Sequence, residues 1–238
     1  MKPDLQEKIK TRGYWRINFQ PLVYQQKISS LGSCRDFVER HIVRLRGWDY
    51  PAFLRKNDEY SGLEPAADFY LGWVDWENHK EFWHMYQSGQ FLHYLALRED
   101  WLEEGGWHRQ LAEQIRTMSS LGIRGVVYQM TEVFEFLCRL AGAEIYEEGV
   151  RVSISLNNTQ NRQLWIEDRM RAPFSRVYKT AASKIEFVKQ RVSKSEAIGE
   201  SKEMALQAIT HFFDRFGWHN PTIETLKKDQ NQLLSGKI

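Results

Sequence analysis

The chain has 238 residues, of which 42% are hydrophobic and 27% are charged, and these values are ordinary for a folded protein. Nine Trp, ten Tyr and thirteen Phe exclude a disordered chain, and a formal net charge of +2 does not by itself imply a nucleic-acid or membrane partner. Two cysteines cannot form a disulfide framework, and there is neither an apolar run of about 18 residues nor a secretory signal. We therefore expect a cytoplasmic protein without a membrane partner.

The N-terminal part combines short helices with short strands. Its clearest strand pattern places Trp15, Ile17 and Phe19 on one face and Arg16 and Asn18 on the other. We expect, in chain order, a helix over residues 4–11, a strand over 14–20, a helix beginning at Ser33, a short strand over 43–48, a surface loop over 49–65 and a strand over 69–76.

Residues 81–98 are expected to form the hairpin at the centre of the fold. Two aromatic runs flank Ser88-Gly89, a pair that suits a two-residue turn. With that turn, His84 faces His93 across the two strands. Both faces of the hairpin are apolar or amphipathic, which predicts a central hairpin that is covered on each side.

The second half repeats strands followed by helices. The strongest helical pattern lies at about 125–141, where a wide apolar stripe predicts a buried helix. The other expected elements are a helical region over 99–121, strands over 150–156, 162–166 and 184–192, and helices over 201–216 and 221–234. The strand over 162–166 is expected to return along that over 150–156.

Together these elements predict an α+β fold: a mainly antiparallel β-sheet with a buried helix at about 125–141 and C-terminal helices. We expect a single domain over residues 1–238, with two possible sub-layers at about 1–143 and 144–238.

Two histidines are the only candidate metal ligands. If His84 and His93 share one face of the hairpin, a further His or carboxylate would complete a zinc site and support a hydrolase or another metal-dependent enzyme. The alternative is that both are partly buried histidines with backbone or hydroxyl partners. A register slip of one residue would place them on opposite faces. We assign no catalytic residue and expect no cofactor.

A basic segment at 162–194 is the candidate binding surface. It contains nine Lys or Arg residues and three acidic ones, and aromatic residues are interleaved with them. Such a segment suits a phosphate backbone and its bases, an acidic protein surface, or a solvated face. The candidate nucleic-acid-binding residues are Arg162, Arg169, Arg171, Arg176, Tyr178 and Lys179, together with Arg44 and Arg46.

Three short segments carry a resemblance to a known group. R-G-W-D-Y-P at 46–51, Y-Q-S-G-Q-F at 86–91 and F-F-D-R-F-G-W at 212–218 resemble an uncharacterised family of hypothetical bacterial proteins of similar length. The resemblance implies a bacterial cytosolic setting and implies no activity.

These observations favour a non-catalytic interaction protein, an accessory subunit or adaptor with a protein partner. Nucleic-acid binding by the basic segment is the first alternative. An enzyme with a site near His84 and His93 is the second.

Overall fold

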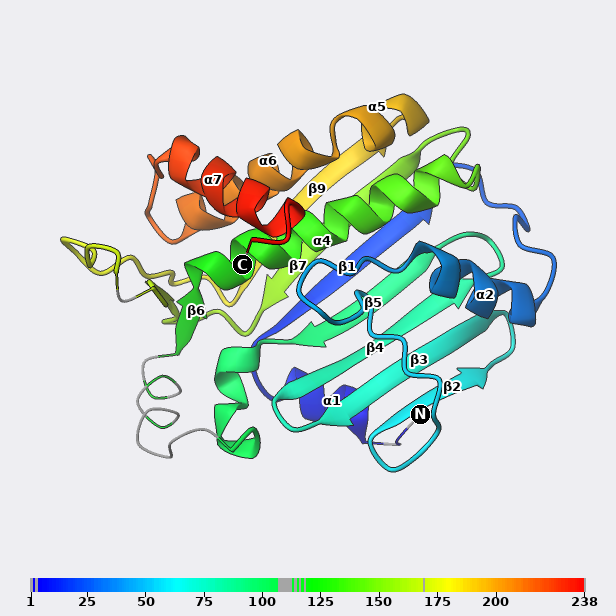
Figure 1. The fold of residues 1–238 in the computed structure, drawn as a ribbon, viewed down its shortest axis with the longest axis horizontal. Helices are drawn as coiled ribbons and strands as arrows, with labels where there is room; N and C mark the ends of the chain where they lie inside the picture. The colour runs from blue at the N-terminus through cyan, green and yellow to red at the C-terminus, as the bar shows by residue number, and fades with distance from the viewer. Residues whose placement is uncertain are drawn as a thin grey trace.

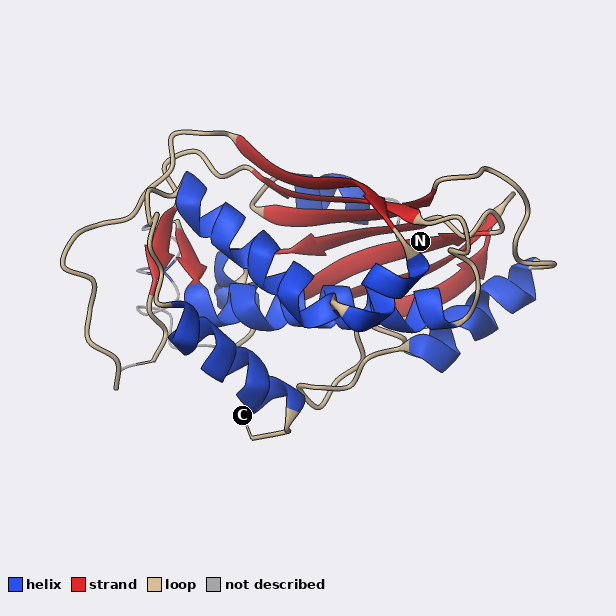
Figure 2. Ribbon diagram, turned by 90° about the horizontal axis from the view of Figure 1, so that it is seen from above, coloured by secondary structure: helices blue, strands red, loops and turns tan. Residues whose placement is uncertain are grey.

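The computed structural model describes residues 2, 4–106, 113, 115, 117, 119–168 and 170–237. Its architecture is α+β, and a seven-stranded antiparallel sheet carries most of the helices on one face (Figure 1 and Figure 2). The fold class predicted from the sequence is therefore confirmed.

The large sheet has the strand order β2-β3-β4-β5-β1-β7-β9. Its strands are β1 (Tyr14–Pro21), β2 (Ser61–Pro65), β3 (Phe69–Trp76), β4 (His79–Tyr86), β5 (Phe91–Ala96), β7 (Val150–Asn157) and β9 (Lys184–Val192). The N-terminal strand β1 joins the hairpin to the later strands, because β5 lies on one side of it and β7 on the other. Strands from both sides of residue 143 thus share one sheet.

The helices are divided unequally between the two faces of this sheet. The helical elements are α1 (Leu5–Lys10), α2 (Leu31–His41), the 3₁₀ turns η1 (Arg98–Asp100) and η2 (Leu102–Glu104), α4 (Ile123–Gly142), α5 (Lys194–Gly199), α6 (Ser201–Arg215) and α7 (Ile223–Leu234). Figure 2 shows α4 and its neighbours along one face. On the other face, Leu5 and Ile9 of α1 pack against Phe82. We call these the helix face and the open face.

The core lies between the helix face and α4. Thirteen side chains of α4 are buried, which confirms the buried helix expected at 125–141. Phe136 of α4 contacts Phe91 of β5 edge to face, with ring centroids 4.8 Å apart. Trp15 of β1 contacts Phe212 of α6 in the same way at 4.8 Å. The odd-numbered residues of β1 therefore face the core, as their alternation predicts.

The central hairpin forms, but its predicted register is wrong by one residue. The β4–β5 loop contains residues 87–89, and Gly89 has a φ of 85°. Gly89 N donates to Tyr86 O at 2.9 Å, and Tyr86 N donates to Gln90 O at 2.9 Å. A three-residue loop that ends in a left-handed glycine replaces the expected two-residue turn. Met85, not Tyr86, therefore lies opposite Phe91.

Several other expectations are corrected. Residues 43–48 form no strand and contribute only the single bridge between Val43 and Tyr50, whereas 61–65, expected as loop, form β2. β8 (Gln163–Trp165) does not return along β7, because it pairs in parallel with β6 (Ser120–Gly122). The helix α2 is capped by Ser30, whose side chain accepts a hydrogen bond from Ser33 N.

The helical region predicted over 99–121 is only partly described. Its described start consists of 3₁₀ turns and its end lies in β6, whereas 107–112, 114, 116 and 118 lie outside the described residues. None of the helices in the described part of the chain combines the length and apolar character that crossing a bilayer requires.

Candidate functional site

Arg162, the first residue of the predicted basic surface, is an interior side chain. It is 4% exposed and makes a two-pronged ion pair with Asp100, at 3.0 and 2.6 Å. Its guanidinium also donates to Ser120 O at 2.7 Å, while Gly13 N donates to Asp100 at 2.8 Å. Arg162 therefore joins β8, β6 and η1 and is not part of a nucleic-acid-binding surface.

Arg46 is likewise used within the fold. Its Nε donates to Glu132 of α4 at 3.0 Å, and its Nη2 donates to Gln129 Oε1 at 3.2 Å. Burial raises the pKa of Glu132, and the charge of Arg46 opposes that rise. Arg44 remains on the surface, where it pairs with Asp49 at 2.6 Å. Arg44 and Arg46 were expected to extend the basic segment. Of the two, only Arg44 is exposed, and its charge is paired with Asp49.

The remaining candidates lie in a long connection between β8 and β9, which we call the 166–180 loop. Arg169 lies outside the described residues. Arg171 is directed inward and binds Asp229 of α7 through both carboxylate oxygens, one of them at 2.8 Å. Arg176 and Lys179 are exposed, and Tyr178 is half-buried between them. Among the described candidate residues of the 166–180 loop, the exposed basic ones are Arg176 and Lys179, and Lys184 and Arg191 of the same basic segment are exposed on β9.

The 166–180 loop projects from one end of the molecule (Figure 1) but is anchored at its base. Phe174 and Tyr178 contact each other edge to face at 4.7 Å, and both contact Trp218, at 5.1 and 5.8 Å. Arg176 donates to Gly217 O at 3.2 Å. The loop therefore has its own small aromatic cluster, packed against the segment that connects α6 and α7.

Two apolar side chains of this loop are directed into solvent. Met170 is 94% exposed and Val177 is 68% exposed. An anchored loop that presents methionine and valine beside arginine and lysine has the composition found at protein interfaces, where Met and Arg are enriched. This loop is the candidate functional site. The sequence pointed to its basic residues, but did not reveal the exposure of its apolar ones.

The predicted pair of histidines is wrong. Trp83 lies opposite His93, and His84 lies opposite Leu92. His93 is therefore on the helix face and His84 on the open face, as expected for a slip of one residue. Among the residues that the structure describes, no three His, Cys, Asp or Glu side chains are grouped so that they could hold a metal ion.

His93 instead belongs to a buried polar network. Its Nδ1 lies 3.2 Å from the Tyr50 hydroxyl and its Nε2 lies 3.5 Å from Glu81 Oε1. His79 donates to Glu81 Oε2 at 3.0 Å and Ala52 N donates to Oε1 at 2.6 Å. Burial alone would raise the pKa of Glu81, but His93 and His79 outweigh it and lower the pKa below its usual range. The network holds the segment around Tyr50 on the sheet.

A second feature that the sequence did not predict is the open face itself. The hairpin was expected to be covered on both sides, but within the part of the chain that the structure describes, α1 and Trp101 cover only part of this face. Beside α1, half-buried rings continue along the strands: Phe69 stacks on His84 at 4.3 Å, and Tyr94 stacks on Tyr14 at 5.8 Å. Arg16 donates to the Tyr94 hydroxyl at 3.1 Å.

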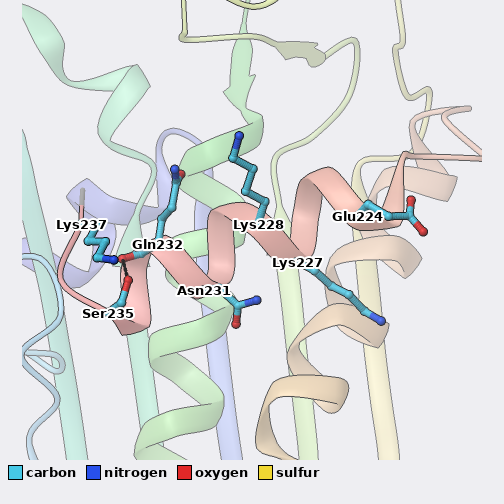
Figure 3. A pocket seen from close by; sticks show the side chains of 7 residues that line it. All are labelled: Glu224, Lys227, Lys228, Asn231, Gln232, Ser235 and Lys237. Carbon is cyan, nitrogen blue, oxygen red and sulfur yellow. Dashed lines mark hydrogen bonds between the residues drawn. The ribbon is translucent and has the colours of Figure 1, made fainter.

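A shallow pocket of about 500 Å³ lies along the outer side of α7 (Figure 3). It is lined by Glu224, Lys227, Lys228, Asn231, Gln232, Ser235 and Lys237. The figure shows Lys227 and Lys228 pointing in different directions, so their charges do not converge on one point. We therefore do not treat this pocket as the functional site.

Comparisons of the chain with protein-family models, with curated proteins and with solved structures found no match.

Proposed function

We propose that the protein is a non-catalytic interaction protein that uses the 166–180 loop to bind a partner protein. The observation that carries this proposal is the exposure of Met170 and Val177 on a loop whose base is anchored. Desolvating two apolar side chains favours association, and an anchored loop loses less conformational entropy on binding than a free one.

The charge around the two apolar side chains suggests the chemistry of the partner. Arg176 and Lys179 are both exposed on the same loop. An apolar patch on the partner with acidic side chains at its rim would match them, and such rim charges mainly increase the rate and specificity of association. A bacterial, cytosolic setting, as the family resemblance implies, belongs to the same proposal.

The two alternatives have less support. Nucleic-acid binding by the 162–194 segment loses Arg162 and Arg171, because both are paired inside the fold. An enzyme site near His84 and His93 would need both histidines on one face of the sheet, but the two side chains lie on opposite faces.

The test compares full-length tagged protein with the variant M170D/V177D as bait in a nuclease-treated lysate of the source cells. The proposal predicts that a protein retained by the wild type binds the variant at least about 30-fold more weakly, as expected when hot-spot side chains are lost. Nuclease treatment excludes contacts that are bridged by nucleic acid.

The matched control is Ile198→Asp, because Ile198 of α5 is also an exposed apolar residue, at 44%. This variant should retain the partner as the wild type does. The proposal is wrong if the wild type retains no protein, or if M170D/V177D retains the same protein with the same affinity.

A further inference from the structure

A second surface is separate from the 166–180 loop: the part of the open face that no helix of the described residues covers. It is formed by β4, β5, β1 and β7 and carries Arg16, Asn18, His84, Tyr86, Tyr94 and Arg151. All are half-buried except Arg151, which is exposed. Figure 2 shows the large helices on the opposite side of the sheet.

Aromatic rings occupy the β3–β5 side of this surface. His84 lies between Phe69, with ring centroids 4.3 Å apart, and Phe82, at 5.4 Å, and Tyr86 contacts Phe69 at 5.0 Å. Burial lowers the pKa of His84 to about 4. At neutral pH His84 is therefore an uncharged ring held between Phe69 and Phe82. Tyr86 meets Phe69 at a tilt and His84 edge to face, so we take Tyr86 as the ring on which another flat ring would stack.

Amide side chains and arginines occupy the β1 and β7 side. Gln90 donates to Asn18 at 2.8 Å, which leaves further donor and acceptor positions on both amides. Arg16 lies next to this amide pair on β1, and Arg151 is the exposed residue opposite Gln20 on β7. These groups suit hydrogen bonding to base edges and contact with phosphate.

The positive charge of this surface lies on its β1 and β7 side, whereas the exposed carboxylate of Asp68 lies near His84 and Tyr86 on the β3–β5 side. Glu186 of the neighbouring strand β9 is bound by Lys184 at 3.4 Å and by the Ser153 hydroxyl at 3.1 Å, so its charge is largely offset. Arg16 and Arg151 remain. The β1 and β7 side of the surface therefore complements the phosphates of a ligand whose flat rings lie towards Tyr86.

We propose that the open face binds a single-stranded nucleic acid, with a base stacked on Tyr86 at the end of β4 while Arg16 and Arg151 contact phosphates. A single strand is required because only unpaired bases expose their faces for stacking. Paired bases in a duplex are stacked on one another and would leave the rings of the open face without a partner.

The test measures the fluorescence anisotropy of a labelled, mixed-sequence oligonucleotide of about 20 nucleotides, as a single strand and as a duplex, over a range of salt concentrations. The single strand should bind more tightly than the duplex. Tyr86→Ala should weaken the single-strand complex roughly 5- to 150-fold, the range for losing one stacked base. R16Q/R151Q should reduce the slope of log K against log salt by about 0.7 for each lost phosphate contact.

R176Q/K179Q is the matched control, because it removes two positive charges from the 166–180 loop and should leave binding unchanged. If R16Q/R151Q does not fold, Arg151→Gln alone replaces it, because Arg151 is exposed and its replacement should not disturb the fold. The same salt dependence is then measured with this single variant. The proposal is overturned by no binding at about 100 µM protein, the weak limit of non-specific affinity. It is equally overturned by equal affinity for the duplex, or by weakening in R176Q/K179Q but not in Arg151→Gln.

Discussion

The anchor of the 166–180 loop can be tested through Arg171. Its guanidinium binds Asp229, whose side chain is fully buried, whereas the Arg171 side chain is 28% exposed. Arg171→Ala would leave a buried carboxylate without its partner, a change that costs about 3–5 kcal/mol in a fully buried pair. Because Arg171 is partly exposed, we take the lower end, about 3 kcal/mol, which is roughly a 160-fold change in the folding equilibrium.

Equilibrium urea unfolding followed by Trp fluorescence measures this change, and the melting temperature should fall by about 6–12 °C for a chain of this length. The control Lys179→Ala removes an exposed positive charge from the same loop and should change the free energy of unfolding by less than about 0.5 kcal/mol. The double variant R171M/D229L removes both charges and should lie within about 1 kcal/mol of the wild type.

A loss below about 1 kcal/mol in Arg171→Ala would refute this reasoning. It would mean that the pair behaves as a surface ion pair and that the loop is held mainly by the Phe174–Tyr178–Trp218 cluster. The proposed partner contact would then depend on the aromatic cluster instead of on the ion pair.

Three further predictions concern the sheet and the ends of its elements. Gly72→Ala should cost about 1–3 kcal/mol in urea unfolding, because a Cβ there would lie 2.4 Å from the Trp83 indole; an unchanged midpoint would show that Trp83 can move aside. Arg162→Met should destabilise the protein by about 3–5 kcal/mol, because it leaves buried Asp100 unpaired, and a loss smaller than that of Arg171→Ala would contradict the burial argument. Burial, and the nearby charge of Glu167, raise the pKa of Glu99, which accepts a hydrogen bond from Gly122 N at the start of α4. A raised folded-state pKa gives stability that is present at low pH and is lost as the pH rises through that pKa. The stability of Glu99→Gln relative to the wild type should therefore increase as the pH rises above about 4, the usual pKa of a Glu side chain; parallel curves of unfolding free energy against pH would contradict this.

The hairpin formed by β4 and β5 agrees with the sequence pattern in its strands and differs from it in its turn. The composition of 81–98 predicts two paired strands, and both form. The two candidate turns differ by one loop residue, and only the left-handed conformation of Gly89 distinguishes them. Because side chains alternate along a strand, this one residue separates His84 from His93 and removes the predicted metal site.

The candidate binding residues show the same limit. A run of Lys and Arg indicates a solvated basic surface, but a single charged residue within it can be directed inward. Arg162 and Asp100 are 62 residues apart in the chain, and Arg171 and Asp229 are 58 apart. The local sequence around a basic residue does not show whether a buried carboxylate about 60 residues away in the chain will pair with it.

The sequence by itself determined the strands with clear alternation, the buried helix α4 and the α+β class, because periodic burial depends on residues that are close in the chain. Only the tertiary structure decided that β1 lies between β5 and β7, which arginines are interior and on which face of the sheet the large described helices pack. Those outcomes depend on pairing and packing between distant segments, whose free energies are not encoded in any single stretch of the chain.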